Sequence, residues 1–303
     1  MNCVIVGFGS IGQRHAKILK LLGCRVAVVT HRKIQFPLTY SSLSRALSQE
    51  KPEYIIIANQ TDKHYRSLVE LAASGFNGIV LVEKPLFHVI QEIPDNNFKA
   101  AYVGYNLRFH HILQKIAELI NKDRTLYTQV YVGQYLPKWR PGRDYSMSYS
   151  AKKDQGGGVL LDLSHELDYL RWFFGEWSSM AAMGGKYSSL QIDSDDMYSL
   201  MLVMEKCPMV QIHVNYLDLI SRREITVITE KYSIKADLVQ QTLRINEQLL
   251  EYKFDCDYTY YMQHKAVING TNAPLCTLAE GLNVLEMINA AEQSAKQRKW
   301  INK

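Results

Sequence analysis

The residues with the clearest chemical meaning lie at the start of the chain, where Gly7, Gly9 and Gly12 form the pattern G-x-G-x-x-G. A short apolar run, Cys3–Val6, precedes them, and a segment with helical periodicity follows. Gly7 permits a tight turn, Gly9 lets a pyrophosphate approach the backbone, and Gly12 allows the helix to pack closely on the strand. Free N–H groups at the helix start, near Ile11, would bind the phosphates. The pattern predicts a dinucleotide site; a glycine-rich turn without a ligand is the alternative.

The residues after the second strand-like run, Arg25–Val29, bear on which nicotinamide cofactor would fit. An acidic side chain at this place accepts the ribose 2′-OH of NAD, whereas a cation without an acid admits the 2′-phosphate of NADP. Thr30, His31 and Arg32 follow the strand, and no carboxylate does. Because Arg32 could hold a phosphate with two hydrogen bonds, we expect NADP(H) to be preferred over NAD(H). A solvated basic loop is the alternative.

A second group of chemically useful residues, Asp162, His165 and Asp168, lies in a segment with helical periodicity, 157–174. Spaced by three residues, they can share one face of a helix. His165 is the expected general acid or base, because the usual pKa of imidazole is nearest neutrality. One of the two carboxylates would orient the imidazole or bind substrate hydroxyls. From these residues alone, a surface helix ion pair is favoured over the catalytic interpretation.

The elements that must position these residues follow two patterns. Up to about residue 106, continuous apolar runs alternate with helical segments, which is typical of a doubly wound α/β domain whose parallel sheet is covered on both faces. The expected strands are Cys3–Val6, Arg25–Val29, Tyr54–Ala58, Ile79–Val82 and Ala101–Tyr105, and the expected helices are Ile11–Leu22, Leu43–Ser48 and His64–Ala73. We therefore predict a Rossmann dinucleotide-binding domain over residues 1–106.

The remainder of the chain has the strict alternation of apolar and polar residues that is typical of an antiparallel sheet, as at Met209–Tyr216. Further strands are expected at Leu126–Gln134, Met197–Met204, Glu224–Thr229 and Tyr232–Ala236, and helices at His111–Asn121, Gly157–Phe174 and Leu278–Ile288. Residues 107–303 are thus predicted to form an α+β domain with a largely antiparallel open sheet.

Composition limits the class of protein. In 303 residues the apolar share is 47% and the charged share 21%, as in ordinary globular proteins. The net charge of +5 comes from scattered basic residues, which gives no support for nucleic-acid binding. Five widely spaced cysteines without a C-x-x-C pattern suggest no metal site and a reducing compartment. Since no signal peptide or membrane-length apolar run is visible, we expect a cytoplasmic protein without membrane contact.

Three further motifs occur in a recognisable order: Glu83-Lys84-Pro85, then Gly104–Phe109, then Gly156–Asp168. With the opening glycines they closely resemble the glucose–fructose oxidoreductase/inositol dehydrogenase (Gfo/Idh/MocA) family. The resemblance covers nearly the whole chain, including a helix start at Ala279–Leu282 and a closing Ser294.

Members of that family are mostly NAD(P)-dependent dehydrogenases or reductases of sugars and cyclitols. The resemblance implies that Lys84 lies beside the nicotinamide, often next to a cis bond at Pro85, and that Asp162 and His165 face it across the cleft. It also implies a homodimer or homotetramer formed through the C-terminal sheet. In most members this Asp and His are four residues apart, whereas here they are three apart, which affects the role of Asp162 more than that of His165.

The resemblance suggests a division of the chemistry. The cofactor would transfer the hydride, His165 would move the proton, and Lys84 would stabilise negative charge on the substrate oxygen. The residues expected to bind the cofactor are Gly7, Gly9, Ser10, Ile11, Gly12, Thr30, His31, Arg32, Asn59, Gln60, Thr61, His64, Glu83 and Lys84. For Thr61 and Asp62, an N-cap role is the alternative.

Substrate contacts are predicted in two other places. Asn106 and Arg108, past the fifth strand, would contact substrate or pin the domain junction. The loop Lys138–Tyr145 carries cations and aromatic rings that suit a sugar bearing an anion, although a solvated loop is as plausible. The predicted substrate residues are Asn106, Arg108, Trp139, Arg140, Arg143 and Asp168.

The function expected from this set is hydride transfer between NADP(H) and a sugar or nucleotide-linked sugar in carbohydrate biosynthesis. Two alternatives stay open. One is a dinucleotide-binding regulator without turnover, which would not need Lys84, His165 and Asp162 together. The other is a redox-neutral sugar-processing enzyme that oxidises its cofactor only transiently.

Overall fold

The structure is a computed structural model that describes residues 1–271 and 274–303, and it divides into two compact units. The first unit comprises Met1–Phe109 and Asp255–Leu282, and the second comprises His110–Phe254 and Asn283–Lys303. The first boundary lies three residues from the expected one. No helix among the described residues has both the length and the apolar content needed to cross a membrane.

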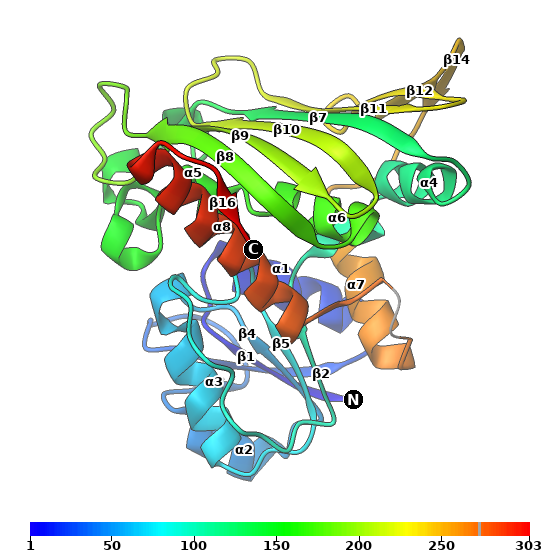
Figure 1. The fold of residues 1–303 in the computed structure, drawn as a ribbon. Coiled ribbons are helices and arrows are strands. Elements are labelled where there is room, and N and C mark those ends of the chain that lie inside the picture. The colour runs from blue at the N-terminus through cyan, green and yellow to red at the C-terminus, as the bar shows by residue number, and fades with distance from the viewer. Residues whose placement is uncertain (272–273) are drawn as a thin grey trace. The chain divides into compact units, whose positions relative to one another are not determined.

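The first unit is built on a seven-stranded sheet in the order β15-β6-β5-β4-β1-β2-β3 (Figure 1). Its six leading strands are parallel: β1 (Asn2–Val6), β2 (Arg25–Val29), β3 (Thr39–Tyr40), β4 (Tyr54–Ile57), β5 (Ile79–Val82) and β6 (Ala100–Val103). Its helices are α1 (Ser10–Leu21), α2 (Leu43–Glu50), α3 (His64–Ala73) and α7 (Tyr258–Asn269). Strands such as β4 are buried along their whole length, which explains their continuous apolar sequence. The predicted Rossmann-type fold is confirmed.

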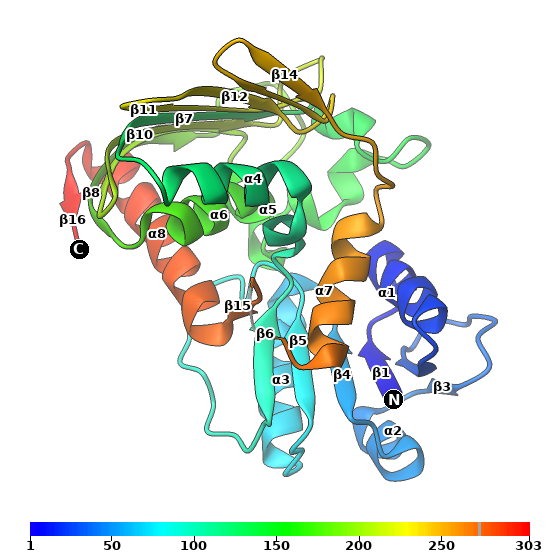
Figure 2. The same ribbon diagram turned by 90° about the vertical axis from the view of Figure 1, so that its right-hand side faces the viewer.

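The assignment of all residues after 106 to the second domain is wrong for the segment 255–282. Helix α7 packs against α1, as Figure 2 shows, and contributes Ala266 and Val267 to the apolar core of the first unit. The two-residue strand β15 (Cys276–Thr277) then pairs with the edge strand β6. The segment returns because α1 and β6 would otherwise leave apolar surface and unpaired backbone groups exposed.

The second unit contains a nine-stranded sheet in the order β14-β13-β12-β11-β7-β10-β9-β8-β16. Its strands are β7 (Thr125–Gly133), β8 (Trp177–Gly185), β9 (Met197–Met204), β10 (Cys207–Asn215), β11 (Arg222–Thr229), β12 (Ser233–Asp237), β13 (Thr242–Ile245), β14 (Gln248–Glu251) and β16 (Ile301–Asn302). All neighbours are antiparallel except β7 and β10. The prediction of a largely antiparallel sheet is confirmed.

One face of this sheet carries the helices of the second unit. They are α4 (His111–Ile120), α5 (Val159–Asp162), α6 (His165–Phe174) and the greater part of α8 (Leu278–Gln297), as Figures 1 and 2 show. Residues along β9 alternate between buried and accessible positions. Tyr198, Leu200 and Leu202 are buried, and Met201 points to the accessible face. The opposite face of the sheet therefore has no helix covering it among the described residues.

The single helix predicted over 157–174 is two helices. Helix α5 ends at Asp162, Leu163 leaves the helical region with φ −100° and ψ 33°, and α6 begins at His165. Asp162 and His165 therefore do not share one helix face, and that part of the spacing argument is wrong. The argument holds for His165 and Asp168, which both lie in α6.

A buried ion pair fixes α6 on the sheet. Glu166 is fully buried, and its two carboxylate oxygens accept hydrogen bonds of 2.9 and 3.2 Å from the guanidinium of Arg223 on β11. A matched cation of this kind offsets the cost of burying a carboxylate. The pair therefore determines where the neighbouring His165 is held.

We predict that Arg223→Met destabilises the protein by about 3–5 kcal/mol, because it leaves the Glu166 carboxylate buried without its cation. The double variant Glu166→Leu/Arg223→Met removes both charges and should recover most of that loss. Denaturant unfolding of the three proteins measures the difference. A double variant as unstable as Arg223→Met would show that the pair is not the cause.

Candidate functional site

The turn between β1 and α1 needs glycine at two positions for steric reasons. Gly7 has φ +98°, and a Cβ there would lie 2.5 Å from the backbone of Asn59. A Cβ at Gly12 would lie 2.2 Å from the carbonyl oxygen of Gly7. The helix can therefore approach the strand this closely only without side chains at these positions.

Gly9 is different, because no described atom lies within 4 Å of its ideal Cβ position. It is the N-cap residue of α1, and no side chain caps the helix there. In the part of the chain that the structure describes, the first N–H groups of α1, from Ser10 and Ile11 onward, therefore have no side-chain cap and lie beside open space. This arrangement fits the pyrophosphate of a dinucleotide, which a helix N-terminus binds through its N–H groups and positive dipole end.

The segment after β2 lies at the surface. The Thr30 hydroxyl accepts a 3.2 Å hydrogen bond from the Arg32 backbone, and His31 and Arg32 are exposed. With no carboxylate between residues 30 and 33, nothing there would repel a phosphate. The contacts of Thr30, His31 and Arg32 with a cofactor stay predictions.

The residues after β4 are held mainly by the protein itself. The Asn59 amide donates a 2.8 Å hydrogen bond to Ser67, while its buried Oδ1 has no hydrogen-bond partner among the described residues. Neither Thr61 nor Asp62 caps a helix with its side chain, so their N-cap alternative finds no support. Asn59 Oδ1 is the best placed of these groups to accept a ligand hydrogen bond, whereas Gln60 and Thr61 stay predicted contacts.

His64 is buried at the start of α3, and its Nδ1 lies 3.0 Å from the carbonyl oxygen of Pro85. Burial lowers the pKa of His64, so the ring is neutral at pH 7 and donates one N–H to that carbonyl. Its observed contacts hold the segment that follows Lys84. A direct contact between His64 and a cofactor stays a prediction.

The Glu83-Lys84-Pro85 motif directly follows β5. The Lys84–Pro85 peptide bond is cis, as the family resemblance implied. Glu83 is buried, its Oε1 lies 2.8 Å from His15 Nε2, and its Oε2 accepts the Lys84 backbone N–H at 3.3 Å. These contacts of Glu83 are therefore with protein groups, and they orient the segment carrying Lys84.

Asn106 and Arg108 have structural partners within the first unit. The Asn106 amide donates a 2.6 Å hydrogen bond to Thr259 in α7. Arg108 is almost fully buried and donates 3.1 and 3.3 Å hydrogen bonds to Glu280 and the Leu275 carbonyl. These contacts join the end of the first chain segment to the returning one within the first unit, whereas a contact with substrate or a role at the domain junction stays a prediction.

In the second unit, two tyrosines surround Asp162. The Tyr216 hydroxyl donates a 2.6 Å hydrogen bond to Asp162 Oδ2, and Tyr149 also bonds to this carboxylate. Burial, and after it the charge of Asp162, raise the pKa values of both phenols well above normal, so both remain proton donors. Asp162 therefore anchors α5, which argues against an acid–base role.

Two of the predicted substrate residues lie at these tyrosines. The Trp139 ring packs edge-to-face on Tyr216 at 5.2 Å, and the Arg140 guanidinium lies 5.6 Å from the centre of the Tyr149 ring. Arg143 is exposed on the same loop, and Asp168 is buried in α6. The structure thus brings Trp139 and Arg140 together with Asp162, through residues that the sequence reasoning missed.

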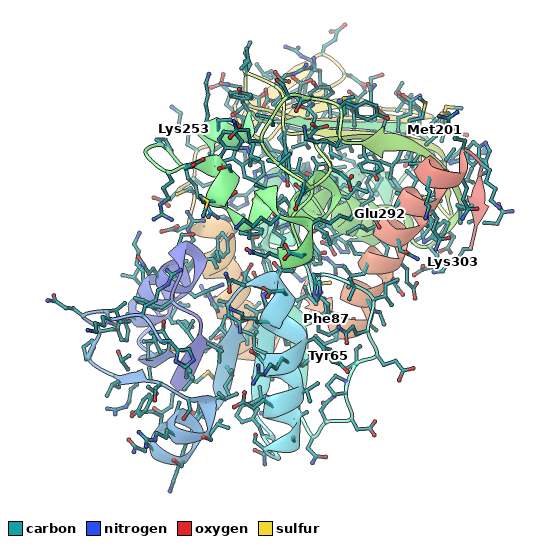
Figure 3. The ribbon with its side chains drawn as sticks, turned by 90° about the vertical axis from the view of Figure 1, so that its left-hand side faces the viewer. Tyr65, Phe87, Met201, Lys253, Glu292 and Lys303 are labelled. Atoms are coloured by element: carbon teal, nitrogen blue, oxygen red, sulfur yellow. The ribbon has the colours of Figure 1, made fainter. Side chains whose placement is uncertain are left out.

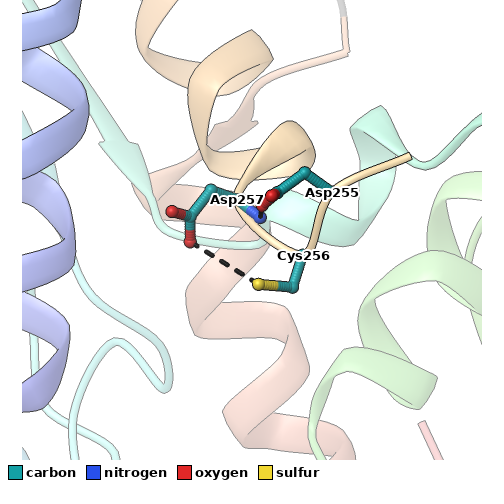
Figure 4. Close-up of side chains that lie close together, drawn as sticks. All are labelled: Asp255, Cys256 and Asp257. Carbon is teal, nitrogen blue, oxygen red and sulfur yellow. Dashed lines mark hydrogen bonds between the residues drawn. The ribbon is translucent and has the colours of Figure 1, made fainter.

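An exposed cluster of Asp255, Cys256 and Asp257 could in principle hold a metal ion (Figure 4). The carboxylate of Asp257 is already paired with two cations, Arg14 Nε at 3.0 Å and Lys17 Nζ at 2.7 Å. Asp257 precedes α7, so these pairs hold the start of that helix against α1. The cluster is better explained as this structural contact.

Gly9 and Gly12 provide a matched pair of variants. We predict that Gly12→Ala destabilises the protein by about 1–3 kcal/mol through overpacking against the Gly7 carbonyl. Gly9→Ala should change stability by less than about 1 kcal/mol, because its Cβ enters open space, yet it should weaken NADPH binding by obstructing the pyrophosphate. Denaturant unfolding and NADPH fluorescence titration separate the effects; unchanged NADPH affinity in Gly9→Ala would contradict this site.

Two protein-family models and a curated relative match this chain. Residues 1–101 match the oxidoreductase family with an NAD-binding Rossmann fold, and residues 115–235 match the GFO/IDH/MocA C-terminal domain. An uncharacterized oxidoreductase from Synechocystis sp. is 28% identical over 160 residues, which cover 48% of this chain and 40% of that protein.

Solved structures share the fold over the full chain. The WlbA dehydrogenase from Bordetella pertussis, in complex with NADH and UDP-GlcNAcA, has a TM-score of 0.82 at 21% identity, with 100% of this chain and 98% of that chain covered. Levoglucosan dehydrogenase, in complex with NADH, has a TM-score of 0.85 at 17% identity with the same coverage. On the two family matches, which together span most of the sequence, this chain belongs to the GFO/IDH/MocA family of oxidoreductases.

Proposed function

We propose that this protein transfers hydride between a nicotinamide dinucleotide, preferably NADP(H), and a sugar or nucleotide-linked sugar. The observation that carries the proposal is the uncapped start of α1 beside the open space at Gly9. The family supports redox chemistry on a nicotinamide cofactor. A substrate of this class is supported by WlbA dehydrogenase and levoglucosan dehydrogenase, whose structures have the same fold.

The preference for NADP(H) rests on the segment after β2. A cation without an adjacent acid favours a ribose 2′-phosphate, and Arg32 is exposed with its guanidinium available for two hydrogen bonds. The two structures compared above contain NADH, so the preference is a property of this chain's own residues rather than of its relatives.

The chemistry divides between the cofactor and four side chains. A bound nicotinamide supplies the hydride acceptor or donor. In the oxidative direction, His165 takes the proton from the substrate hydroxyl while Lys84 stabilises the negative charge that develops on the oxygen. Asp168, one turn further along α6, lies on the same helix face as His165 and would bind a substrate hydroxyl or orient the imidazole. Asp162 holds the preceding helix in place.

The substrate class follows from the loop around Trp139. An indole ring and the cations Arg140 and Arg143 suit a sugar that carries a phosphate or carboxylate. Because Trp139 and Arg140 pack on the two tyrosines that hold Asp162, the loop and α5 would move as one when such a ligand binds.

We also propose that two or four copies assemble through the helix-free face of the nine-stranded sheet. Apolar side chains stand on this face. Met201, with 43% of its surface exposed, is labelled in Figure 3, and Met183, with 77% exposed, lies on the same face of the neighbouring strand β8. Exposed methionines on an open sheet are costly in a monomer and are typical of a protein interface. A cytoplasmic location and a biosynthetic role complete the proposal.

The cofactor preference is tested by titrating the protein with NADPH and NADH separately, following quenching of the tryptophan fluorescence. We expect tighter NADPH binding, and roughly a tenfold loss of NADPH affinity in Arg32→Gln with little change for NADH, because a charge-assisted bond to phosphate is lost. Lys99→Gln, a surface lysine of the same unit, is the control. Equal loss for both cofactors would contradict a 2′-phosphate contact.

The roles of Lys84 and His165 are tested by turnover of a panel of nucleotide-linked and acidic sugars, followed by the nicotinamide absorbance. Lys84→Ala and His165→Ala should each lower kcat by about 10²–10⁴-fold, the usual contribution of a positioned proton-transfer or charge-stabilising group. NADPH affinity should change far less.

A double variant tests whether Lys84 and His165 act together, and two other outcomes would point to the alternative functions. If both residues act on one substrate oxygen, Lys84→Ala/His165→Ala should lose less than the product of the single effects. Cofactor binding without turnover on any sugar would favour a regulator. Product formed without a net change in nicotinamide absorbance would favour redox-neutral processing.

A further inference from the structure

Four buried side chains from four elements form one continuous hydrogen-bonded chain beneath the cofactor-binding turn. Tyr54 Oη on β4 lies 3.0 Å from His264 Nδ1 on α7, and His264 Nε2 lies 2.7 Å from His15 Nδ1 on α1. His15 Nε2 then lies 2.8 Å from Glu83 Oε1 at the end of β5. None of the four residues is more than 6% exposed, so their hydrogen bonds are made mainly within the protein.

The donor and acceptor at each link follow from the ends of the chain. The Glu83 carboxylate only accepts, so His15 must donate from Nε2. When His15 carries only this proton, its Nδ1 accepts from His264 Nε2, and the Tyr54 hydroxyl donates to His264 Nδ1. When His15 carries a second proton, it donates to His264 Nε2, and His264 Nδ1 donates to Tyr54. In the first arrangement both imidazoles carry their proton on Nε2, and only there does the Tyr54 hydroxyl donate within the chain.

Burial, and after it the neighbouring His15, keep the pKa of His264 well below normal, and burial raises that of Tyr54 well above normal, so in both arrangements His264 is neutral and Tyr54 keeps its proton. The hydrogen bond of the Tyr54 hydroxyl favours the first arrangement. The reversed arrangement needs a second proton on His15. In that arrangement the Tyr54 oxygen accepts from His264, and the hydroxyl proton must point away from His264 into a buried region. Leaving the buried hydroxyl proton of Tyr54 without an acceptor costs free energy.

The far end of the chain touches the proposed catalytic segment. Glu83 Oε2 accepts the backbone N–H of Lys84, and a Cβ at Gly104 would lie only 2.8 Å from Glu83 Oε1. The carboxylate is thus clamped between the His15 ring, the Gly104 backbone and Lys84. His15 also lies on α1, one turn beyond Gly12, so the chain joins the phosphate-binding helix to Lys84.

We propose that Tyr54 and His264 are positioning residues: the Tyr54 hydroxyl selects the Nε2–H form of both imidazoles and thereby fixes the Glu83 carboxylate against Lys84. The inference rests on the proposed function only for the role of Lys84. The tautomer and the orientation of Glu83 are properties of the protein that can be measured without any substrate.

The test uses full-length protein labelled with ¹⁵N in its histidine rings, with His15 and His264 assigned from the spectra of His15→Gln and His264→Gln. In the wild type at neutral pH, both rings should show a protonated Nε2 and an unprotonated Nδ1. Tyr54→Phe removes only the hydroxyl, so the fold should persist. In this variant the His264 nitrogens should move toward averaged shifts, because neither tautomer is then favoured by a partner at Nδ1.

Tyr65→Phe is the matched control, because Tyr65 packs on Phe87 by an edge contact in the same unit and takes no part in the chain (Figure 3). It should leave both imidazoles unchanged. An Nδ1–H or doubly protonated ring in the wild type would overturn the proposal, and so would unchanged ring nitrogens in Tyr54→Phe.

A second readout separates positioning from simple stability. The backbone amide of Lys84 should exchange with solvent faster in Tyr54→Phe than in the wild type, since its acceptor is held less firmly. On an accepted substrate, kcat should fall by roughly tenfold while KM and NADPH affinity change little. If the tautomers shift and Lys84 exchange rises but no sugar is turned over, the proposed function fails and the positioning chain stands. Unchanged Lys84 exchange would refute the positioning role.

Discussion

The contact between Gly12 and the carbonyl oxygen of Gly7 determines much of the first unit. A Cβ at Gly12 would lie 2.2 Å from that oxygen, so α1 reaches its place beside β1 only because the side chain is missing. This close packing directs the first N–H groups of α1 toward the open space at Gly9. It also brings His15, one turn along the helix, within hydrogen-bonding distance of Glu83. One steric requirement thus sets both the helix end that we propose binds phosphate and the buried polar chain that continues to Lys84.

In the second unit, the main constraint is the burial of several polar side chains of α6 in an otherwise apolar layer. Helix α6 buries Glu166 and Asp168 as well as His165. Burial of Glu166 is tolerated because Arg223 matches its charge, and the Asp162 carboxylate is satisfied by Tyr149 and Tyr216. These contacts have strict geometry, whereas apolar packing alone would allow α5 and α6 to slide. The polar contacts therefore specify the position of His165.

Local pattern predicted the elements whose signal lies within a few residues. The strand β2 and the helix α3 have the predicted bounds, Arg25–Val29 and His64–Ala73, because continuous burial and helical periodicity are visible in the sequence itself. The break at Leu163 was not predicted, because Gly157–Phe174 keeps its apolar spacing across it. The last residue before the break, Asp162, is bonded to Tyr216, which lies far away in sequence. The return of α7 to the first unit was missed for the same reason.

The residues of the candidate site also fall into those with a local sequence signal and those set by contacts that are distant in sequence. The glycines, Lys84 and His165 lie in motifs and could be recognised, whereas Tyr149, Tyr216 and His264 could not, because their partners lie tens to hundreds of residues away. His15 does have a local signal, because a histidine on the buried face of a helix, one turn after the glycines, is unusual. That signal could have predicted a buried polar partner. Asp162 was recognised, but its two tyrosine partners give it a structural role that spacing could not reveal.

The central claim, that a dinucleotide binds at the start of α1, is tested most directly by amide hydrogen exchange with and without NADPH. The account predicts that the amides of residues 10–13 and 30–33 exchange more slowly when NADPH is present, because phosphates cover the helix end and the 2′-phosphate orders the segment after β2. Protection at residues 10–13 with NADH as well, but at 30–33 with NADPH only, would support both parts of the claim. Unchanged exchange at residues 10–13 at saturating NADPH would contradict it.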